Sequence, residues 1–248
     1  MTMPDPRTGQ SRSSSGVPLT VIMPAYNEES GIRAAVKEVQ EEVLDKVPGA
    51  NLLVVNDGSE DNTANILGEL ASNDSRIAVI NQPNLGHGPS LIRAMNQASG
   101  ERFFLIDSDM QIPLNCFGEL WKLSNSVDAV FGVRSKRNDP PHRLFLSALT
   151  ACVLGAIFKV KLPDSNSPFK ILKREIWEDM NSKLGNERLL APSIFLAIYA
   201  NKHNYKVILV PVTHKARKTG HSSLNLVSLS RFGINGFRQI IEYKDRLS

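Results

Sequence analysis

Short apolar runs alternate with helix-length amphipathic segments from Leu19 to Val133, and this alternation limits the fold more than any other feature of the sequence. The runs have the length and composition of strands, and the segments between them carry apolar residues near helical spacing. Strands that alternate with helices form right-handed crossovers, so we expect an α/β fold with a mostly parallel central sheet and helices on both faces. The expected strands are 19–23, 52–56, 76–81, 102–107 and 128–133, and the expected helices are 29–47, 61–71, 88–98 and 113–124.

The second half of the chain is less regular, but no linker or internal repeat separates it from the first. We therefore expect a single domain over 17–248, with an N-terminal half at 17–135 and a C-terminal half at 136–248. Residues 1–16 are polar and rich in Ser, Pro and Gly, which is typical of a disordered leader. The expected elements of the second half are helices at 144–158, 190–202 and 224–243, an extended piece at 169–172 and a strand at 206–211.

Composition and charge restrict the class of partner. The apolar stretch 144–158 is shorter than the roughly twenty residues of a membrane-spanning helix, so we expect it to be buried or interfacial. A net charge of +4 suits an anionic ligand or an acidic membrane surface, but no dense basic stripe predicts a nucleic-acid partner. Cys116 and Cys152 lie far apart without a neighbouring Cys or His, which favours a reducing compartment. We expect a cytoplasmic protein that is at most peripheral on the cytoplasmic face of a membrane.

The acidic cluster Asp107-Ser108-Asp109 follows the apolar run 103–106 and so comes at the end of a predicted strand. Ligands of open α/β sheets bind at this carboxyl edge. Mg²⁺ is typically held there by one or two carboxylates, with substrate phosphates completing its shell. The cluster therefore predicts a divalent-cation site beside a bound diphosphate. Two other interpretations stay open, namely a simple turn after the strand and a phosphatase whose nucleophile is Asp107.

Two further loops follow predicted strands and converge on the same edge. The first is Pro24-Ala25-Tyr26-Asn27-Glu28-Glu29, and the second runs from Asn56 to Thr63. In the second loop, Asp57 offers an acceptor for a base N–H or a ribose hydroxyl, and Gly58 would let a flat ring approach the backbone. Tyr26 offers a ring face or a hydroxyl. Each loop alone is also good turn chemistry, but three together favour a nucleotide site.

The segment Asn84-Leu85-Gly86-His87-Gly88 is not a dinucleotide fingerprint, because Leu91 stands where a third Gly would be needed. A turn with two Gly before a helix remains. We expect Gly86 to let the backbone pass close to the ligand, and we interpret His87 as an exposed turn residue rather than a catalyst.

In their order and spacing, these four motifs resemble family 2 inverting glycosyltransferases with a GT-A fold. The resemblance implies a nucleotide-diphospho-sugar donor, of the GDP-mannose or UDP-glucose type, bound in the N-terminal half. It also implies Mg²⁺ or Mn²⁺ held by Asp107, Asp109 and Gln111. The donor-binding residues that it implies are Pro24, Tyr26, Asn27, Glu28, Asp57, Gly86, Asp107, Ser108, Asp109, Gln111 and Arg217.

The second half resembles the branch of the family that acts on polyprenyl phosphates, typified by dolichyl-phosphate mannose synthase. The similar stretches are 131–134, 143–147, 164–170, 210–212 and 217–222. The resemblance implies a polyprenyl or dolichyl phosphate acceptor gripped by Arg134, Arg143 and Ser147 in an acceptor half with interfacial helices. It adds peripheral membrane contact and a membrane-anchoring partner subunit as expected partners. Two residues depart from the branch's pattern: Pro168 replaces a Gly, and Ser223 replaces a Lys.

The resemblance implies catalytic roles for Asp109, Arg217 and Asp164. The metal and Arg217 would offset charge on the leaving diphosphate. A phosphate acceptor is already anionic near neutral pH and needs no general base. A soluble hydroxyl acceptor would need one, and Asp164 or Glu187 is the candidate, because Glu178-Asp179 falls within an expected surface helix. A protein that only senses nucleotide sugars is a further alternative.

Overall fold

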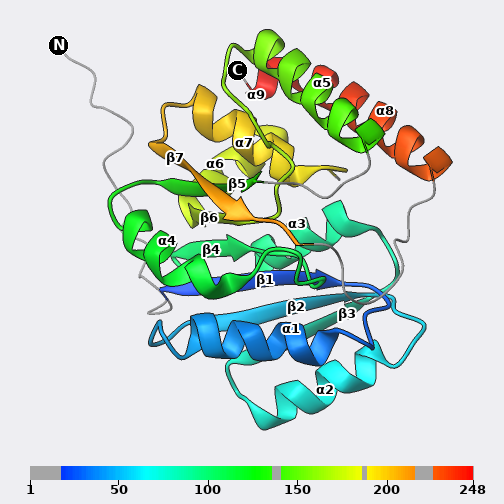
Figure 1. The fold of residues 1–248 in the computed structure, drawn as a ribbon, viewed down its shortest axis with the longest axis vertical. Helices are drawn as coiled ribbons and strands as arrows, with labels where there is room; N and C mark the ends of the chain where they lie inside the picture. Colours follow the sequence, from blue (N-terminus) through cyan, green and yellow to red (C-terminus); the bar gives the residue numbers. More distant parts are fainter. Residues whose placement is uncertain (1–17, 136–140, 186–188, 216–225, 248) are drawn as a thin grey trace.

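The computed structural model describes residues 18–135, 141–185, 189–215 and 226–247 (Figure 1). These residues form a seven-stranded sheet in the order β3-β2-β1-β4-β6-β5-β7, with helices on both faces. All neighbouring strands are parallel except at β6, which runs antiparallel to β4 and β5. The predicted α/β fold with a mostly parallel sheet is confirmed. The strands are β1 (Leu19–Ala25), β2 (Asn51–Asp57), β3 (Ile77–Gln82), β4 (Arg102–Leu105), β5 (Ala129–Ser135), β6 (Lys170–Lys173) and β7 (Val207–Thr213).

The helices follow the predicted alternation, with differences at their ends. The first expected helix begins at Ile32 instead of residue 29, because residues 28–31 form a turn in which Gly31 N and Ile32 N both donate to Glu28 O. The expected helix at 113–124 begins as a short 3₁₀ turn. The helices are α1 (Ile32–Val39), continued by the π-helical η1 (Gln40–Leu44), α2 (Thr63–Asn73), α3 (His87–Gln97), η2 (Leu114–Cys116), α4 (Phe117–Ser124), α5 (Pro141–Phe158), α6 (Arg174–Leu184), α7 (Pro192–Lys202), α8 (Leu226–Glu242) and α9 (Lys244–Leu247).

Each face of the sheet has its own apolar core, because successive side chains of a strand point to opposite faces. In β1, Val21 and Met23 belong to the core that also contains residues of α1, α2 and α4, whereas Ile22 belongs to the other core. That second core contains residues of α3, α6, α7 and α9. Burial on both faces explains why the central strands are almost wholly apolar. Among the helices that the structure describes, none is both long and apolar enough to pass through a bilayer.

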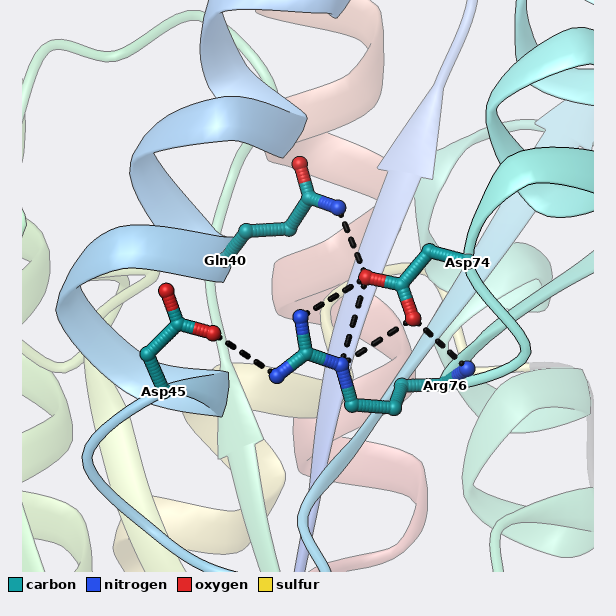
Figure 2. A network of polar contacts seen from close by, with 4 residues as sticks. All are labelled: Gln40, Asp45, Asp74 and Arg76. Carbon is teal, nitrogen blue, oxygen red and sulfur yellow. Dashed lines mark hydrogen bonds and ion pairs between the residues drawn. The ribbon is translucent and has the colours of Figure 1, made fainter.

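Four polar residues form a clamp at the amino edge of the sheet, which we call the amino-edge clamp: Gln40, Asp45, Asp74 and Arg76 (Figure 2). The Arg76 guanidinium donates to Asp45 Oδ1 at 2.8 Å and to Asp74 Oδ2 at 2.8 Å. Gln40 Nε2 donates to the same Asp74 oxygen at 2.7 Å. Hydrogen bonds from Arg76 hold the pKa of Asp74 well below its usual range. The clamp joins the end of η1 to the connection between α2 and β3. It therefore lies at the edge of the sheet opposite to the predicted site.

Candidate active site

The loops that follow β1 and β2 are hydrogen-bonded to each other at the carboxyl edge. Asn27 N donates to Ser59 Oγ at 3.0 Å, and Glu60 N donates back to Asn27 Oδ1 at 2.8 Å. Glu28 N donates to Thr63 Oγ1 at 2.9 Å. Asn27 has a positive φ of 53°, a conformation that Asn tolerates better than most residues. Asn27 and Glu28 therefore fix the shape of the rim. The partly exposed Tyr26 lies in the same loop, and the buried Pro24 lies near the end of β1.

Asp57, at the end of β2, is buried and organises the loop that follows β3. Its Oδ1 accepts from Gln82 Nε2 at 2.6 Å and from Leu85 N at 2.9 Å, and its Oδ2 accepts from Gly86 N at 2.8 Å. Gly58 packs closely against the loop after β3, so the structure gives a packing reason for a glycine here, and the approach of a ligand ring stays a prediction. A Cβ added to Gly58 would lie 2.5 Å from Asn84 N. Gly86, with a φ of 95°, ends this loop and caps α3.

His87 connects this loop to the acidic cluster after β4. Its Nε2 lies 3.0 Å from Asp107 Oδ1. Desolvation lowers the pKa of His87, but its hydrogen bond to Asp107 and the neighbouring negative charges outweigh this and leave it raised. Desolvation likewise raises the pKa of Asp107, yet the hydrogen bond with His87 and nearby positive charges bring it below its usual value. His87 is exposed, as predicted, but it contacts the site, which the sequence interpretation missed.

The segment after β7 is held against the acidic cluster. Lys215 N donates to Gln111 O at 2.8 Å, and Gln111 Nε2 donates to Lys215 O at 3.2 Å. Within the cluster, Gln111 N donates to Asp109 Oδ1 at 3.1 Å. Met110 between them has a positive φ of 54°, so the chain turns sharply here. Arg217, the predicted diphosphate ligand two residues beyond Lys215, lies outside the described residues.

The oxygen donors present fit a hard divalent cation that a ligand helps to hold. Asp107 and Asp109 supply carboxylates, and the Gln111 amide uses its nitrogen toward Lys215 O, which leaves Oε1 as the oxygen donor. Across the described ranges, no three His, Cys, Asp or Glu side chains are grouped to hold a metal by themselves. A site of two carboxylates and one amide therefore fits Mg²⁺ or Mn²⁺ when diphosphate oxygens complete the shell.

Arg134 and Asp164, predicted for the acceptor side, bind each other. Arg134 Nε and Nη2 donate to the two Asp164 oxygens at 2.8 Å each, and Arg134 N adds a third bond at 3.0 Å. The side chains are only 14% and 4% exposed. Arg134 also lines one pocket together with Asp107, Asp109 and Gln111. The structure thus brings a predicted acceptor residue beside the predicted metal ligands.

Lys170, the first residue of β6, is a buried cation at this edge that the sequence interpretation gave no role. Its Nζ donates to the carbonyls of Ser165 and Ser167 and lies 5.4 Å from the centre of the Phe131 ring. Burial lowers the pKa of Lys170 to about 7, against the raising effect of the Asp164 carboxylate. Lys170 therefore fixes the loop that carries Asp164.

The remaining predicted residues are placed less completely. Ser108, which lies between Asp107 and Asp109 in the sequence, is buried. Ser147 is partly exposed on α5. Arg143 belongs to the first turns of α5, but its side chain lies outside the described residues, as does all of Glu187.

The family described as Glycosyl transferase family 2 matches residues 20–187. The chain belongs to this family. Membership favours the glycosyltransferase interpretation of the acidic cluster over the phosphatase and sensor interpretations.

Relatives and solved structures agree with this membership. The chain is 27% identical over 214 residues to an undecaprenyl-phosphate 4-deoxy-4-formamido-L-arabinose transferase of Serratia proteamaculans, covering 85% of this chain and 64% of that protein. It is 25% identical over 231 residues to the uncharacterized glycosyltransferase YkcC of Bacillus subtilis, covering 90% of this chain and 68% of YkcC. This chain thus spans about two thirds of the length of these relatives.

The fold matches that of solved structures. Glucosyl-3-phosphoglycerate synthase from Mycobacterium tuberculosis, solved with Mn²⁺, UDP and phosphoglyceric acid, superposes with a TM-score of 0.65 at 18% identity. The superposition covers 95% of this chain and 80% of the synthase. The predicted GT-A fold is confirmed.

Proposed function

We propose that this protein transfers a hexose from a nucleotide-diphospho-sugar to a polyprenyl phosphate, with inversion and with Mg²⁺ or Mn²⁺. The observation that carries the proposal is that Asp107, Asp109, Gln111 and Arg134 line one and the same pocket. It places carboxylates suited to a metal–diphosphate beside a guanidinium suited to a phosphate. The undecaprenyl-phosphate transferases among the relatives support a lipid-phosphate acceptor.

The donor would lie along the rim formed by the loops after β1, β2 and β3. Asp57 would accept from the nucleoside, and the loop from Pro24 to Glu28 would line the nucleoside site. When bound, the metal supplies charge stabilisation for the leaving diphosphate. Arg217 would add a second positive charge there, and the Gln111–Lys215 contacts would hold the chain that leads to Arg217 close to the acidic cluster.

At the acceptor, Arg134, Arg143 and Ser147 would bind the lipid phosphate. A phosphate oxygen attacks the anomeric carbon, the bond from that carbon to the diphosphate breaks, and the nucleoside diphosphate leaves. The attacking phosphate is already anionic, so no group has to remove a proton. Asp164 would act as a positioning residue, because its carboxylate accepts three hydrogen bonds from Arg134. A carboxylate so occupied is a poor general base.

Two helices of the acceptor half offer an apolar surface for a membrane. Leu149 on α5 is 48% exposed, and on α8 Ile234, Phe237 and Ile241 are 56%, 37% and 39% exposed. On α8 these residues recur at helical spacing, as in helices that lie in a bilayer interface. The protein would thus work peripherally on the cytoplasmic face of a membrane, with or without an anchoring subunit.

The test incubates purified protein with labelled nucleotide sugars, Mn²⁺ or Mg²⁺, and polyprenyl phosphate, and then separates organic and aqueous phases. Label in the organic phase with one donor is the expected result, and EDTA should abolish it. If no donor delivers label to the lipid, the lipid acceptor is wrong.

Transfer to a soluble phosphorylated acceptor is a second candidate, supported by the phosphoglyceric acid bound in the similar synthase. In the same assay, with phosphoglyceric acid in place of the lipid, this function would give a labelled phosphorylated product in the aqueous phase. Replacing the Asp164 carboxylate would then give no information about a general base, because the attacking group of the acceptor is again an anion.

A further inference from the structure

We propose that Asp57 and Gln82 make the donor site selective for uracil over guanine. The proposal rests on the proposed function, since it takes Asp57 as the residue that meets the base. The loop after β3 donates hydrogen bonds to the Asp57 carboxylate and so limits the hydrogen bonds that a ligand can still donate to it.

The orientation of the Gln82 side chain is fixed by its neighbours. Arg93 Nη1 lies 3.3 Å from Gln82 Oε1, and a guanidinium only donates. The other end of the amide faces Asp57 Oδ1 at 2.6 Å and Ser90 Oγ at 3.0 Å, and a carboxylate only accepts. Ser90 Oγ donates in turn to Gly86 O at 2.9 Å. The nitrogen of Gln82 therefore points at Asp57, and this buried network has a single consistent arrangement.

The two oxygens of Asp57 consequently differ. An ionised carboxylate offers about two acceptor positions on each oxygen. On Oδ1 both are taken, by Gln82 Nε2 and by Leu85 N. On Oδ2 the described residues take one, through Gly86 N at 2.8 Å. Asp57 can thus accept one further hydrogen bond at Oδ2, but it cannot bind a ligand through both oxygens.

The difference between the two oxygens of Asp57 should favour the binding of uracil over that of guanine. Guanine presents N1–H and the 2-amino group side by side, a pair of donors that a carboxylate satisfies through both oxygens. At Asp57 one of the two donors would be left without a partner, which weakens binding. Uracil presents a single ring N–H at N3, which matches one free position on Oδ2. Cytosine has a lone pair at N3 but carries a donor in its 4-amino group, which a single free position can also accept, so this asymmetry does not separate cytosine from uracil.

Binding of free nucleotides tests the proposal without any sugar transfer. Isothermal titration with UDP and GDP in the presence of Mn²⁺ should give a dissociation constant for UDP at least about tenfold below that for GDP. Gln82→Met removes one hydrogen-bond donor from Asp57 Oδ1. It should therefore reduce the ratio of the dissociation constant for GDP to that for UDP. Equal or tighter binding of GDP by the unmodified protein would overturn the proposal, whatever the variant does.

The matched control is Gln40→Met in the amino-edge clamp. This substitution also removes an amide donor from a carboxylate, because Gln40 Nε2 donates to Asp74 Oδ2 at 2.7 Å. It should lower stability and leave the ratio of UDP to GDP affinity unchanged. If the control narrows the ratio as much as Gln82→Met does, selectivity does not come from Asp57. If none of the nucleotides binds, the proposed function itself fails, which is a different outcome from loss of selectivity.

Discussion

At the amino edge of the sheet, Asp45 and Asp74 share the guanidinium of Arg76, whereas at the carboxyl edge Asp107 is hydrogen-bonded to the half-exposed imidazole of His87 at 3.0 Å. Two strong cations near the carboxyl edge form hydrogen bonds with groups outside the acidic cluster. Arg134 binds Asp164, and Lys170 binds two backbone carbonyls. The amino-edge clamp therefore satisfies its charges within the protein, while the carboxyl edge keeps acidic oxygens for a ligand.

This difference suggests that the two edges contribute differently to the molecule. The amino-edge clamp should stabilise the fold and have no effect on turnover. The acidic cluster should matter for turnover and contribute less to stability than the clamp, because Asp107 is hydrogen-bonded to a half-exposed imidazole rather than to a guanidinium. Substitutions at each edge can separate these contributions.

The largest effect is expected for Asp109→Ala. Loss of a metal carboxylate should reduce metal-dependent transfer by on the order of 100-fold or more, because the charge on the leaving diphosphate loses its stabilisation. The measurement is initial rate against Mn²⁺ concentration, with urea unfolding in parallel. Arg76→Ala is the control from the other edge and should keep its rate. Retained metal-dependent turnover in Asp109→Ala would remove the metal role.

Asp164→Ala should give the largest loss of stability. It leaves the buried Arg134 guanidinium without its carboxylate, and breaking a buried pair costs about 3 kcal/mol. Urea unfolding of Asp164→Ala, Arg134→Met and the double variant measures the coupling between the two residues. The double variant should be less destabilised than the sum of the single variants. Simple additivity would show that the pair is not a structural unit.

Arg76→Ala should cost about 2 kcal/mol at pH 7, less than the buried pair because Arg76 is 38% exposed. The pKa of Asp74 is lowered in the folded state, so the stabilisation is present above the unfolded pKa of about 3.9 and is lost as the pH falls further. The unfolding free energies of the parent and the variant should therefore converge in acid. A difference that stays constant from pH 7 to pH 2 would contradict this.

The smallest expected effect is a dependence of the unfolding free energy on pH that is due to Lys170. Its folded pKa of about 7 lies below the unfolded value of about 10.4, so between these the unfolded chain binds a proton that the folded one lacks. Stability should rise with pH in this window, by about 1 kcal/mol between pH 7 and pH 8. Lys170→Met should lack this rise, which the difference between the two urea titrations measures. Parallel titrations would mean that Lys170 keeps its proton.

Some features of the two edges could be predicted from the sequence, and others could not. The alternating pattern predicted the strands and the mostly parallel sheet, because hydrophobic periodicity is a local property visible in a short window. The motifs at 24–28, 56–63 and 107–111 predicted the edge at which a site forms, since parallel strands present their ends together. The clamp of Gln40, Asp45, Asp74 and Arg76 was not predicted, because it depends on contacts between separate elements.

The sequence by itself determined the α/β class, the family and the position of the acidic pair Asp107 and Asp109. Only the tertiary structure decided which hydrogen-bonding groups of those loops are already occupied by other residues of the protein. His87 reaches Asp107, Gln82 occupies one oxygen of Asp57, and Asp164 binds Arg134. The physical reason is that each of these bonds joins loops from different strands, and their partners follow from the order of strands in the sheet. No local pattern in the chain specifies that order.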